Sequence, residues 1–328
     1  MNAIWFAAIV PGVIAIGVIG ALRASRMAAR LADHPNERSL HAAPKARVGG
    51  IGMALAVAPL AAVYAHGPLA AAFGAAGALA LLSLADDLRS LPVEVRLPAH
   101  AVAAIVFVLA ITQPPAIEWP WGWLGAALAA VGLVWAANLF NVMDGSDGLA
   151  GGMTAIGFAA LAAGAAQGGF AELALLCAAL SSAAAGFLVW NFPPARVFMG
   201  DAGSIPLGFL AGALGTYGVL AGAWPAWFPL LVFSPFVVDA TLTLVRRVAL
   251  GERFWVAHRS HAYQRLVLAG WSHRRLVLAA YAVMAAAGAS ALVARAGSPM
   301  LQCGILFVWA AAYALLMAAI RSITRRKA

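Results

Sequence analysis

The chain has 328 residues, of which 64% are hydrophobic and 10% are charged, and its formal net charge is +9. A soluble domain carries about 25% charged and about 45–50% apolar residues, so this composition excludes a water-soluble globular protein. The positive charge needs no nucleic acid, because cytoplasmic loops of membrane proteins are enriched in Lys and Arg. The same charge favours anionic lipid headgroups and nucleotide phosphates as partners.

Long apolar runs recur along the chain, and each is sufficient to cross roughly 30 Å of hydrocarbon as a helix. The runs lack the alternation of a β-strand, so helices are expected rather than a barrel. The expected fold class is an all-α integral membrane protein with about 11 transmembrane helices. The expected spans are Asn2–Leu22, Gly50–His66, Leu69–Ala85, Leu97–Thr112, Trp123–Phe140, Gly151–Gln167, Phe170–Trp190, Ser204–Ala221, Trp227–Val245, Arg275–Val293 and Met300–Ile320.

The basic residues predict the orientation of these spans. With the N-terminus outside, every Lys and Arg except Arg295 falls on the cytoplasmic side, as the distribution of charge in membrane proteins requires. We therefore expect a periplasmic N-terminus and a cytoplasmic C-terminus. The first span is not expected to be a signal peptide, because its basic residues follow the apolar run. No repeat or linker divides residues 1–328, which are expected to form one membrane domain.

Most acidic residues lie at the expected cytoplasmic ends of helices. Asp86 and Asp87 end the third span, Asp144 and Asp147 follow the fifth, and Asp201 follows the seventh. Carboxylates that share a site repel one another unless one is protonated or a cation binds. Oxygen ligands suit Mg²⁺, which usually completes its coordination shell with substrate phosphates. The pattern therefore predicts a phosphorylated substrate at the cytoplasmic face.

Residues 138–152 carry much of this chemistry. Asn138, Asn141 and Asp144 recur at every third position, so they share one side of a helix end. The glycines that follow let the backbone approach a ligand closely, and Asp201 likewise lies between glycines at the start of a helix, where amide groups favour phosphate. An acidic pair alone is more often solvated, and an Asp–Gly pair is more often a turn. The coincidence of three such clusters on one face favours a site.

A histidine loop precedes the tenth expected span. His258 and His261 could bind a metal at this spacing, but contact with phosphate beside Arg259 is favoured. Asp239 lies inside the ninth span, either as an internal hydrogen-bonding residue or as a functional acid. Four further histidines are interpreted as surface or interface residues, namely His34, His66, His100 and His273.

These motifs resemble those of the polyprenyl-phosphate N-acetylhexosamine-1-phosphate transferases, glycosyltransferase family 4. The matching segments follow the family order: 33–41 with Gly49 and Gly50, Asp86 and Asp87 with Leu91 and Pro92, 138–152, 194–201, and the histidine loop ending at Gly270 and Trp271. The resemblance implies that a UDP-N-acetylhexosamine gives its sugar 1-phosphate to undecaprenyl phosphate, with release of UMP. This would occur at the cytoplasmic face of the bacterial inner membrane.

The resemblance also implies cofactors and partners. The cofactor would be Mg²⁺, with Mn²⁺ as the alternative ion. The chain would contact membrane lipids and no nucleic acid, and a homodimer is one assembly that the resemblance allows.

Roles for individual residues follow from the matching motifs. Metal ligands would be Asp147 and Asp201. Catalytic residues would be Asp86, Asp87, Asp144 and His261, with Asp86 as the base that deprotonates the lipid phosphate, or else orients it. Substrate-binding residues would be Asn138, Asn141, Arg96, Arg196, His258, Arg259 and Phe198, the last stacking on uracil. Arg96 replaces a family lysine that contacts phosphate.

One departure from the family concerns the histidine loop. The common loop reads His-x-His-His, whereas Tyr263 and Gln264 stand where the His pair would be. This form resembles a branch that initiates O-antigen or related surface polysaccharide. That branch is associated with N-acetylglucosamine or a 6-deoxy-N-acetylhexosamine such as FucNAc or QuiNAc. The departure argues against the peptidoglycan precursor as product.

Two other classes of protein stay open. An intramembrane prenyltransferase would also hold Mg²⁺ with Asn- and Asp-rich helix ends, but it would leave His261 and the segment around Asp201 without a role. A transporter of a phosphorylated or lipid-linked substrate would place ionisable residues near the bilayer midplane, often in two repeated halves. Here the acids cluster at one face instead.

Overall fold

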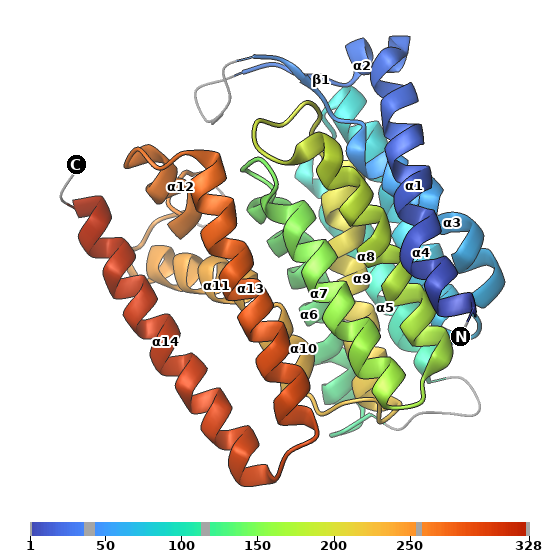
Figure 1. Cartoon of the computed structure of the whole chain (residues 1–328), viewed down its shortest axis with the longest axis vertical. Coiled ribbons are helices and arrows are strands. Elements are labelled where there is room, and N and C mark those ends of the chain that lie inside the picture. Colours follow the sequence, from blue (N-terminus) through green and yellow to red (C-terminus); the bar gives the residue numbers. More distant parts are fainter. Residues whose placement is uncertain (1, 36–42, 113–118, 254–257, 326–328) are drawn as a thin grey trace.

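The structure, a computed structural model, describes residues 2–35, 43–112, 119–253 and 258–325, and most of these are helical (Figure 1). The helices are α1 (Asn2–Ala24), α2 (Arg26–Arg30), α3 (Gly49–Tyr64), α4 (Pro68–Arg89), α5 (Val93–Ile111), α6 (Trp123–Met143), α7 (Leu149–Gln167), α8 (Ala171–Asn191), α9 (Asp201–Leu220), α10 (Trp227–Val232), α11 (Ser234–Ala249), α12 (Ala262–Leu268), α13 (His273–Arg295) and α14 (Pro299–Arg325). A short antiparallel hairpin pairs β1 (Ala32–Asp33) with β2 (Lys45–Ala46).

Nine of the described helices are long and apolar enough to cross a membrane, and α3 adds a shorter apolar helix. This confirms the expected all-α, multi-pass membrane protein. Each expected span except Trp227–Val245 coincides with one continuous helix. The sides on which the two ends of the chain lie stay a prediction.

The expected span Trp227–Val245 is wrong as a single helix, because the chain forms α10 and α11 with Phe233 at their junction. Pro235 lies in the first turn of α11. A proline has no N–H to continue the hydrogen bonds of α10, and it disfavours helical backbone in the residue before it. The break lets α11 run across the direction of the long helices (Figure 1).

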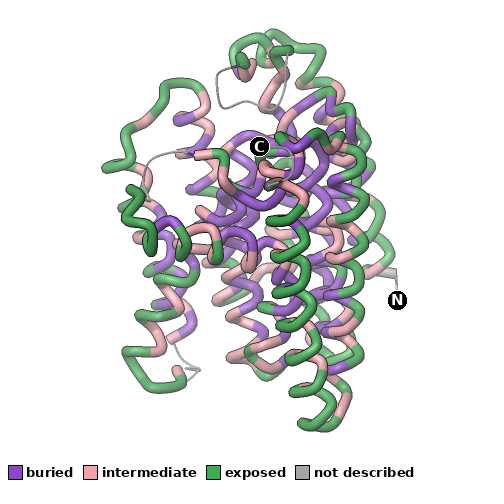
Figure 2. The backbone as a smooth tube through the Cα atoms, turned by 90° about the vertical axis from the view of Figure 1, so that its left-hand side faces the viewer, coloured by how far each residue is buried: buried purple, intermediate pink, exposed green. Residues whose placement is uncertain are grey.

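Buried residues concentrate in the middle of the bundle (Figure 2). Over their most apolar 18 residues α8 and α9 are each 72% buried, whereas α14 is 11% buried. The central helices are therefore α8 and α9, and α14 is peripheral. Because α9 is central, its first residue, Asp201, is held at a fixed position relative to the neighbouring helices.

Glycine packing holds α1 against α8. A Cβ atom at Gly186 would overlap the carbonyl group of Gly12, and the amide of Gly12 donates to Ser182 Oγ at 2.9 Å. Small residues at such positions let two membrane helices approach closely, so that dispersion forces and backbone contacts hold them together.

We expect Gly186→Ala to lower the thermal unfolding temperature of the protein in detergent. The added methyl group must push α1 away from α8, and overpacking of this kind costs about 1–3 kcal/mol. The matched control is Gly17→Ala on α1, where a Cβ would meet no atom within 4 Å. That control should unfold at the same or a higher temperature, since Ala is the better helix former. Equal destabilisation by both variants would contradict the glycine contact.

Candidate active site

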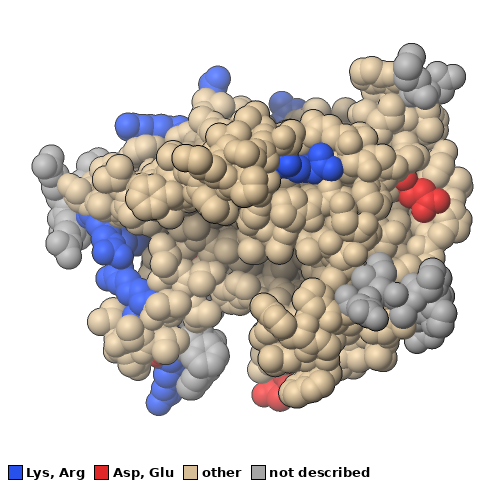
Figure 3. All heavy atoms as spheres, turned by 90° about the horizontal axis from the view of Figure 1, so that it is seen from below, with Lys and Arg blue, Asp and Glu red and all other residues tan. Residues whose placement is uncertain are grey.

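The acidic helix ends meet at one end of the bundle. There the C-terminal ends of α4 and α6 lie beside the N-terminal end of α9, and the β1–β2 hairpin covers them. Seen from the opposite end, the surface shows only scattered charged side chains and a hollow near its centre (Figure 3). The acids therefore gather at one end of the protein, as the sequence indicates.

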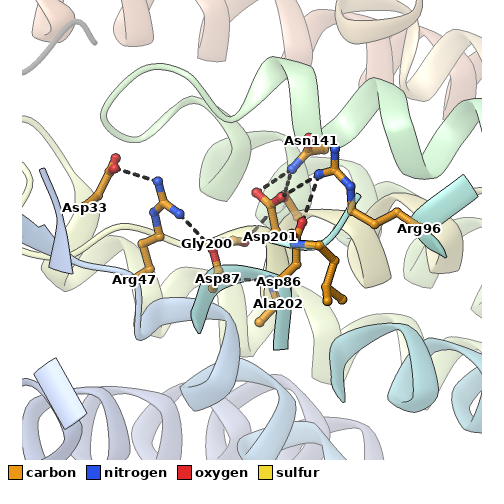
Figure 4. A network of polar contacts seen from close by, with 11 residues as sticks. Asp33, Arg47, Asp86, Asp87, Arg96, Asn141, Gly200, Asp201 and Ala202 are labelled. Carbon is orange, nitrogen blue, oxygen red and sulfur yellow. Dashed lines mark hydrogen bonds and ion pairs between the residues drawn. The ribbon is translucent and has the colours of Figure 1, made fainter. Parts of the chain in front are cut away.

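Arg47 links two of the acids (Figure 4). Its Nη1 donates to Asp87 Oδ1 at 3.0 Å, and its Nη2 donates to Asp33 Oδ1 at 2.5 Å. The side chain of Asp87 is only 1% exposed, and its second oxygen accepts the amide N–H of Ala202 at 3.2 Å. Both oxygens of Asp87 are thus engaged, and they tie the start of α9 to the segment that follows β2.

Asp86 is likewise engaged on both oxygens. Oδ1 accepts the amide N–H of Leu91 at 2.6 Å, and Oδ2 accepts Nη1 of Arg96 at 2.8 Å. The same Nη1 lies 4.0 Å from Asp201 Oδ2. Asp86 therefore holds the Arg96 guanidinium toward Asp201 (Figure 4), a geometry that favours an orienting role for Asp86 over that of a free base.

Asp201 is the most accessible acid of this network. Asn141 Nδ2 donates to Asp201 Oδ1 at 2.8 Å and to Ser204 Oγ at 3.1 Å. The Asp201 side chain is 30% exposed, and its second oxygen faces Arg96 without a close hydrogen bond. A carboxylate held in this way can accept a further ligand.

Asp144 and Asp147 follow α6 but differ in their surroundings. Asp147 Oδ2 accepts the amide N–H of Ala195 at 2.9 Å, and Oδ1 lies 3.5 Å from Lys45 Nζ. Asp144 is half-buried, and the described residues offer its carboxylate no hydrogen bond or ion pair. Burial raises the pKa of Asp144 well above its usual value, and the negative charges of Asp201 and Asp87 raise it further. Asp144 therefore needs a proton or a cation.

The donor set fits a magnesium ion that is shared with a substrate. Within the described ranges, no three His, Cys, Asp or Glu side chains are grouped so that they could hold a metal by themselves. Mg²⁺ usually takes one or two carboxylates and completes its shell with water and substrate phosphates. Asp201 and Asp144 offer such carboxylates. Asp147 has both oxygens engaged in this arrangement, and its role as a ligand stays a prediction.

The histidine loop is anchored by a buried acid. Asp239 on α11 accepts the amide N–H groups of Ala262 and Tyr263 at 2.8 and 3.2 Å, so it caps the start of α12. Its Oδ1 also lies 3.6 Å from Nδ1 of the buried His261. Of the two interpretations of Asp239, these contacts favour the internal hydrogen-bonding residue.

His258 stacks on His261, with 4.9 Å between ring centroids. Burial, together with the charges of the neighbouring His261 and Arg247, lowers the pKa of His258 to about 4. His258 is therefore neutral near pH 7. Arg259 and Arg196, expected to bind substrate, are exposed and make no contact with the acids that the structure describes.

Phe198 lies where the loop before α9 joins the hairpin. Its amide donates to the carbonyl of Ala46 at 2.9 Å, and Lys45 Nζ lies 4.9 Å from the centroid of its ring. Lys45 and Arg47 are the residues that sequence reasoning missed. The available signal was their position, because these two basic residues lie just before Gly49 and Gly50 of the matching segment. Residues 36–41 of the first matching segment lie outside the described residues.

Asn138 does not contact the acids directly. Its Nδ2 donates to the carbonyl of Val134 at 2.7 Å and lies 3.3 Å from Nδ1 of His100. His100, expected at the surface or at an interface, is buried between α5 and α6.

Two apolar grooves run along the helix bundle, and one of them reaches the acidic end. One, of about 710 Å³, separates α3 from α4 over a floor of α9 and reaches Gly50 and Ala202, next to Asp201. The other, of about 400 Å³, lies between α6, α9, α10 and α11. Of the two, only the groove between α3 and α4 offers apolar space close to the acids, because the second is lined by the C-terminal half of α9.

We expect Arg47→Met to destabilise the protein strongly. The change leaves Asp87 buried without its cation, and breaking a buried pair in this way costs about 3–5 kcal/mol. The double variant Arg47→Met/Asp87→Asn should recover much of the loss, since it removes the unpaired charge. Thermal unfolding in detergent measures both effects, with the exposed Arg26→Met as control. A double variant less stable than Arg47→Met would contradict this account of the pair.

The sequence of the chain is similar to those of known proteins. Residues 69–219 match the family described as glycosyl transferase family 4. The chain is 30% identical to the decaprenyl-phosphate N-acetylglucosaminephosphotransferase of Mycolicibacterium smegmatis, over 86% of this chain and 80% of that protein. It is 27% identical to the probable undecaprenyl-phosphate N-acetylglucosaminyl 1-phosphate transferase of Bacillus subtilis, over 84% and 80% of the two chains. The phospho-N-acetylmuramoyl-pentapeptide-transferase of Shouchella clausii is 38% identical, but over 48% of this chain and 47% of that protein.

Proposed function

Because the chain belongs to glycosyl transferase family 4, we propose that it transfers an N-acetylhexosamine 1-phosphate from a UDP-sugar to undecaprenyl phosphate. An oxygen of the lipid phosphate attacks the sugar-linked phosphorus, the bond to the bridging oxygen breaks, and UMP leaves. The observation that carries this proposal is the partly exposed carboxylate of Asp201, held between Asn141 and Arg96 beside the unpartnered Asp144.

The chain's own residues supply positioning and charge. Phosphoryl transfer depends on these more than on covalent chemistry, and Arg96, oriented by Asp86, directs its positive charge toward Asp201. The first amide groups of α9 favour a phosphate in the same place. When bound, Mg²⁺ or Mn²⁺ would neutralise charge on the diphosphate. A phosphate monoester is largely ionised near pH 7, so the lipid phosphate needs no strong base.

The lipid partner follows from the surroundings of the site. Undecaprenyl phosphate carries its reactive group at the end of a hydrocarbon chain, and the apolar groove between α3 and α4 reaches Ala202, the neighbour of Asp201. A UDP-sugar would approach from the aqueous side. We therefore place the protein in the bacterial inner membrane, among membrane lipids, with the active site facing the cytoplasm. The proposed assembly is either a monomer or a homodimer.

The sugar and the pathway form the finer part of the proposal. We propose GlcNAc or a 6-deoxy-N-acetylhexosamine such as FucNAc or QuiNAc, and a role in initiating O-antigen or related surface polysaccharide. The form of the histidine loop supports this choice. Relatives whose names specify N-acetylglucosamine match most of the chain, whereas the pentapeptide transferase matches about half. The prenyltransferase and transporter alternatives are disfavoured by these relatives.

The proposed reaction predicts release of UMP from purified protein that depends on both undecaprenyl phosphate and Mg²⁺. A panel of UDP-N-acetylhexosamines would identify the sugar. Asp201→Ala should lower the rate about 100- to 1,000-fold, as loss of one electrostatic group at a transition state does. The control is Glu172→Gln on α8, whose exposed side chain lies 3.4 Å from His66, and it should keep the wild-type rate. Lipid-independent UMP release, or full activity of Asp201→Ala, would overturn the proposal.

Asp86 gives a separate prediction. In Asp86→Asn the amide can still accept the N–H of Leu91 but loses its charge toward Arg96, a contact worth about 1.5–3 kcal/mol. We expect the rate to fall about 10- to 100-fold with an unchanged pH profile. The measurement is the rate of UMP release between pH 6 and pH 9, roughly the range in which titration of a general base would change the rate. Loss of one limb of the profile would show that Asp86 is the base.

A further inference from the structure

His100 contains a buried atom with no partner. The residue is 4% exposed, and it faces α6 from α5. Its Nδ1 lies 3.3 Å from Asn138 Nδ2, whereas its Nε2 is buried and has no hydrogen-bond partner among the described residues. The large majority of buried polar side-chain atoms do have a partner, so this exception needs a physical explanation.

The hydrogen bonds of Asn138 identify the tautomer of His100. Asn138 Nδ2 also lies 2.7 Å from the carbonyl oxygen of Val134, which can only accept. The atom is therefore the amide nitrogen, and its two hydrogens serve Val134 and His100. Nδ1 of His100 is then an acceptor without a proton, and the neutral ring carries its hydrogen on Nε2. The unpartnered atom is thus a donor, and leaving it unpaired costs about 1–3 kcal/mol.

His100 belongs to a second level of polar contacts below the acids. On α5, Arg96 and His100 are four residues apart and share one face, while on α6 Asn138 and Asn141 are three residues apart. Arg96 and Asn141 contact the acids. Since α5 begins at the acidic end and α6 ends there, His100 and Asn138 lie one turn deeper, about 5 Å further into the bundle.

The unused groups at these two levels are donors. Arg96 Nε is also buried without a hydrogen-bond partner among the described residues. Two N–H groups on one face of α5, with no acceptor among the residues that the structure describes, favour a ligand that supplies oxygen acceptors. A phosphate does so, and donors that are pre-positioned for it bind it strongly.

Resting on the proposed function, we propose that His100 binds the acceptor, with its Nε2–H donating to a phosphate oxygen of undecaprenyl phosphate. The depth of His100 selects this substrate over the UDP-sugar. A lipid phosphate enters from the bilayer and reaches the deeper level first, whereas a nucleotide sugar enters from the aqueous end where the acids lie. His100 is then a specificity-determining residue for the acceptor.

Three substitutions test the donor atom. His100→Leu removes it, and we expect the KM for undecaprenyl phosphate to rise about 10- to 100-fold while the KM for the UDP-sugar stays unchanged. His100→Gln should restore most of the affinity, because a glutamine amide reaches the position of Nε2. His100→Asn should not, because the shorter amide reaches only the position of Nδ1. The control His66→Leu, an exposed histidine, should change neither KM.

Direct binding separates this inference from the proposed function. Undecaprenyl phosphate added to wild-type protein should raise the thermal unfolding temperature, and the rise should shrink in His100→Leu but persist in His100→Gln. Without lipid, His100→Leu should unfold near the wild-type temperature, since it removes an unpaired donor. A change confined to the KM of the UDP-sugar, or an equal lipid-induced shift in wild type and His100→Leu, overturns the role of His100 alone. A wild type that neither binds undecaprenyl phosphate nor releases UMP overturns the proposed function as well.

Discussion

The repulsion among carboxylates at one end of an apolar bundle is the constraint on which the rest of this structure depends. Burying a charge away from water costs free energy unless the charge is paired. Three of the acids are stabilised by different partners. Arg47 and the start of α9 engage Asp87, Arg96 and the turn after α4 engage Asp86, and Lys45 engages Asp147. Only Asp201 and Asp144 keep capacity for a ligand. The hairpin therefore does more than cover the site, because it brings the cations that make the cluster tolerable.

The break between α10 and α11 supports the site from the other side. It directs α11 across the bundle, so that Asp239 can cap α12, and α12 in turn presents Tyr263 to the end of α6. There the Tyr263 hydroxyl donates to the carbonyl of Val142 at 2.9 Å. A Cβ at position 145 would overlap that hydroxyl, which explains the glycine at this point. Tyr263 thus braces the segment that carries Asp144, and it also lines a small, mostly apolar pocket of about 170 Å³.

The sequence predicted the helical spans and the gathering of acids, because both depend on composition and on local order along the chain. Long apolar runs have few alternatives in lipid, and acids at alternate helix ends must share a face. The break before Pro235 was missed, since an uninterrupted apolar run outweighed a single proline. Lys45 and His100 were missed for another reason. Their importance comes from contacts with Asp147 and Asn138, more than 35 positions away, and a pattern of residues does not report such pairings.

In the proposed reaction, two substrates from different solvents meet in this site, and the two polar levels between α5 and α6 would receive one substrate each. The outer level combines acids with Arg96, which suits a metal-bound diphosphate arriving from water. The inner level, His100 with Asn138, is uncharged as long as His100 keeps the tautomer that Asn138 imposes. Burying an uncharged donor in the bundle costs much less free energy than burying a further cation. The uncharged donor can still donate a hydrogen bond to an anion. A lysine or arginine in its place would pair with the nearby acids and block their other contacts. A neutral donor does not pair with these acids. In the proposal, the inner level can therefore bind the lipid phosphate without disturbing the charge balance of the outer level, where the diphosphate would bind.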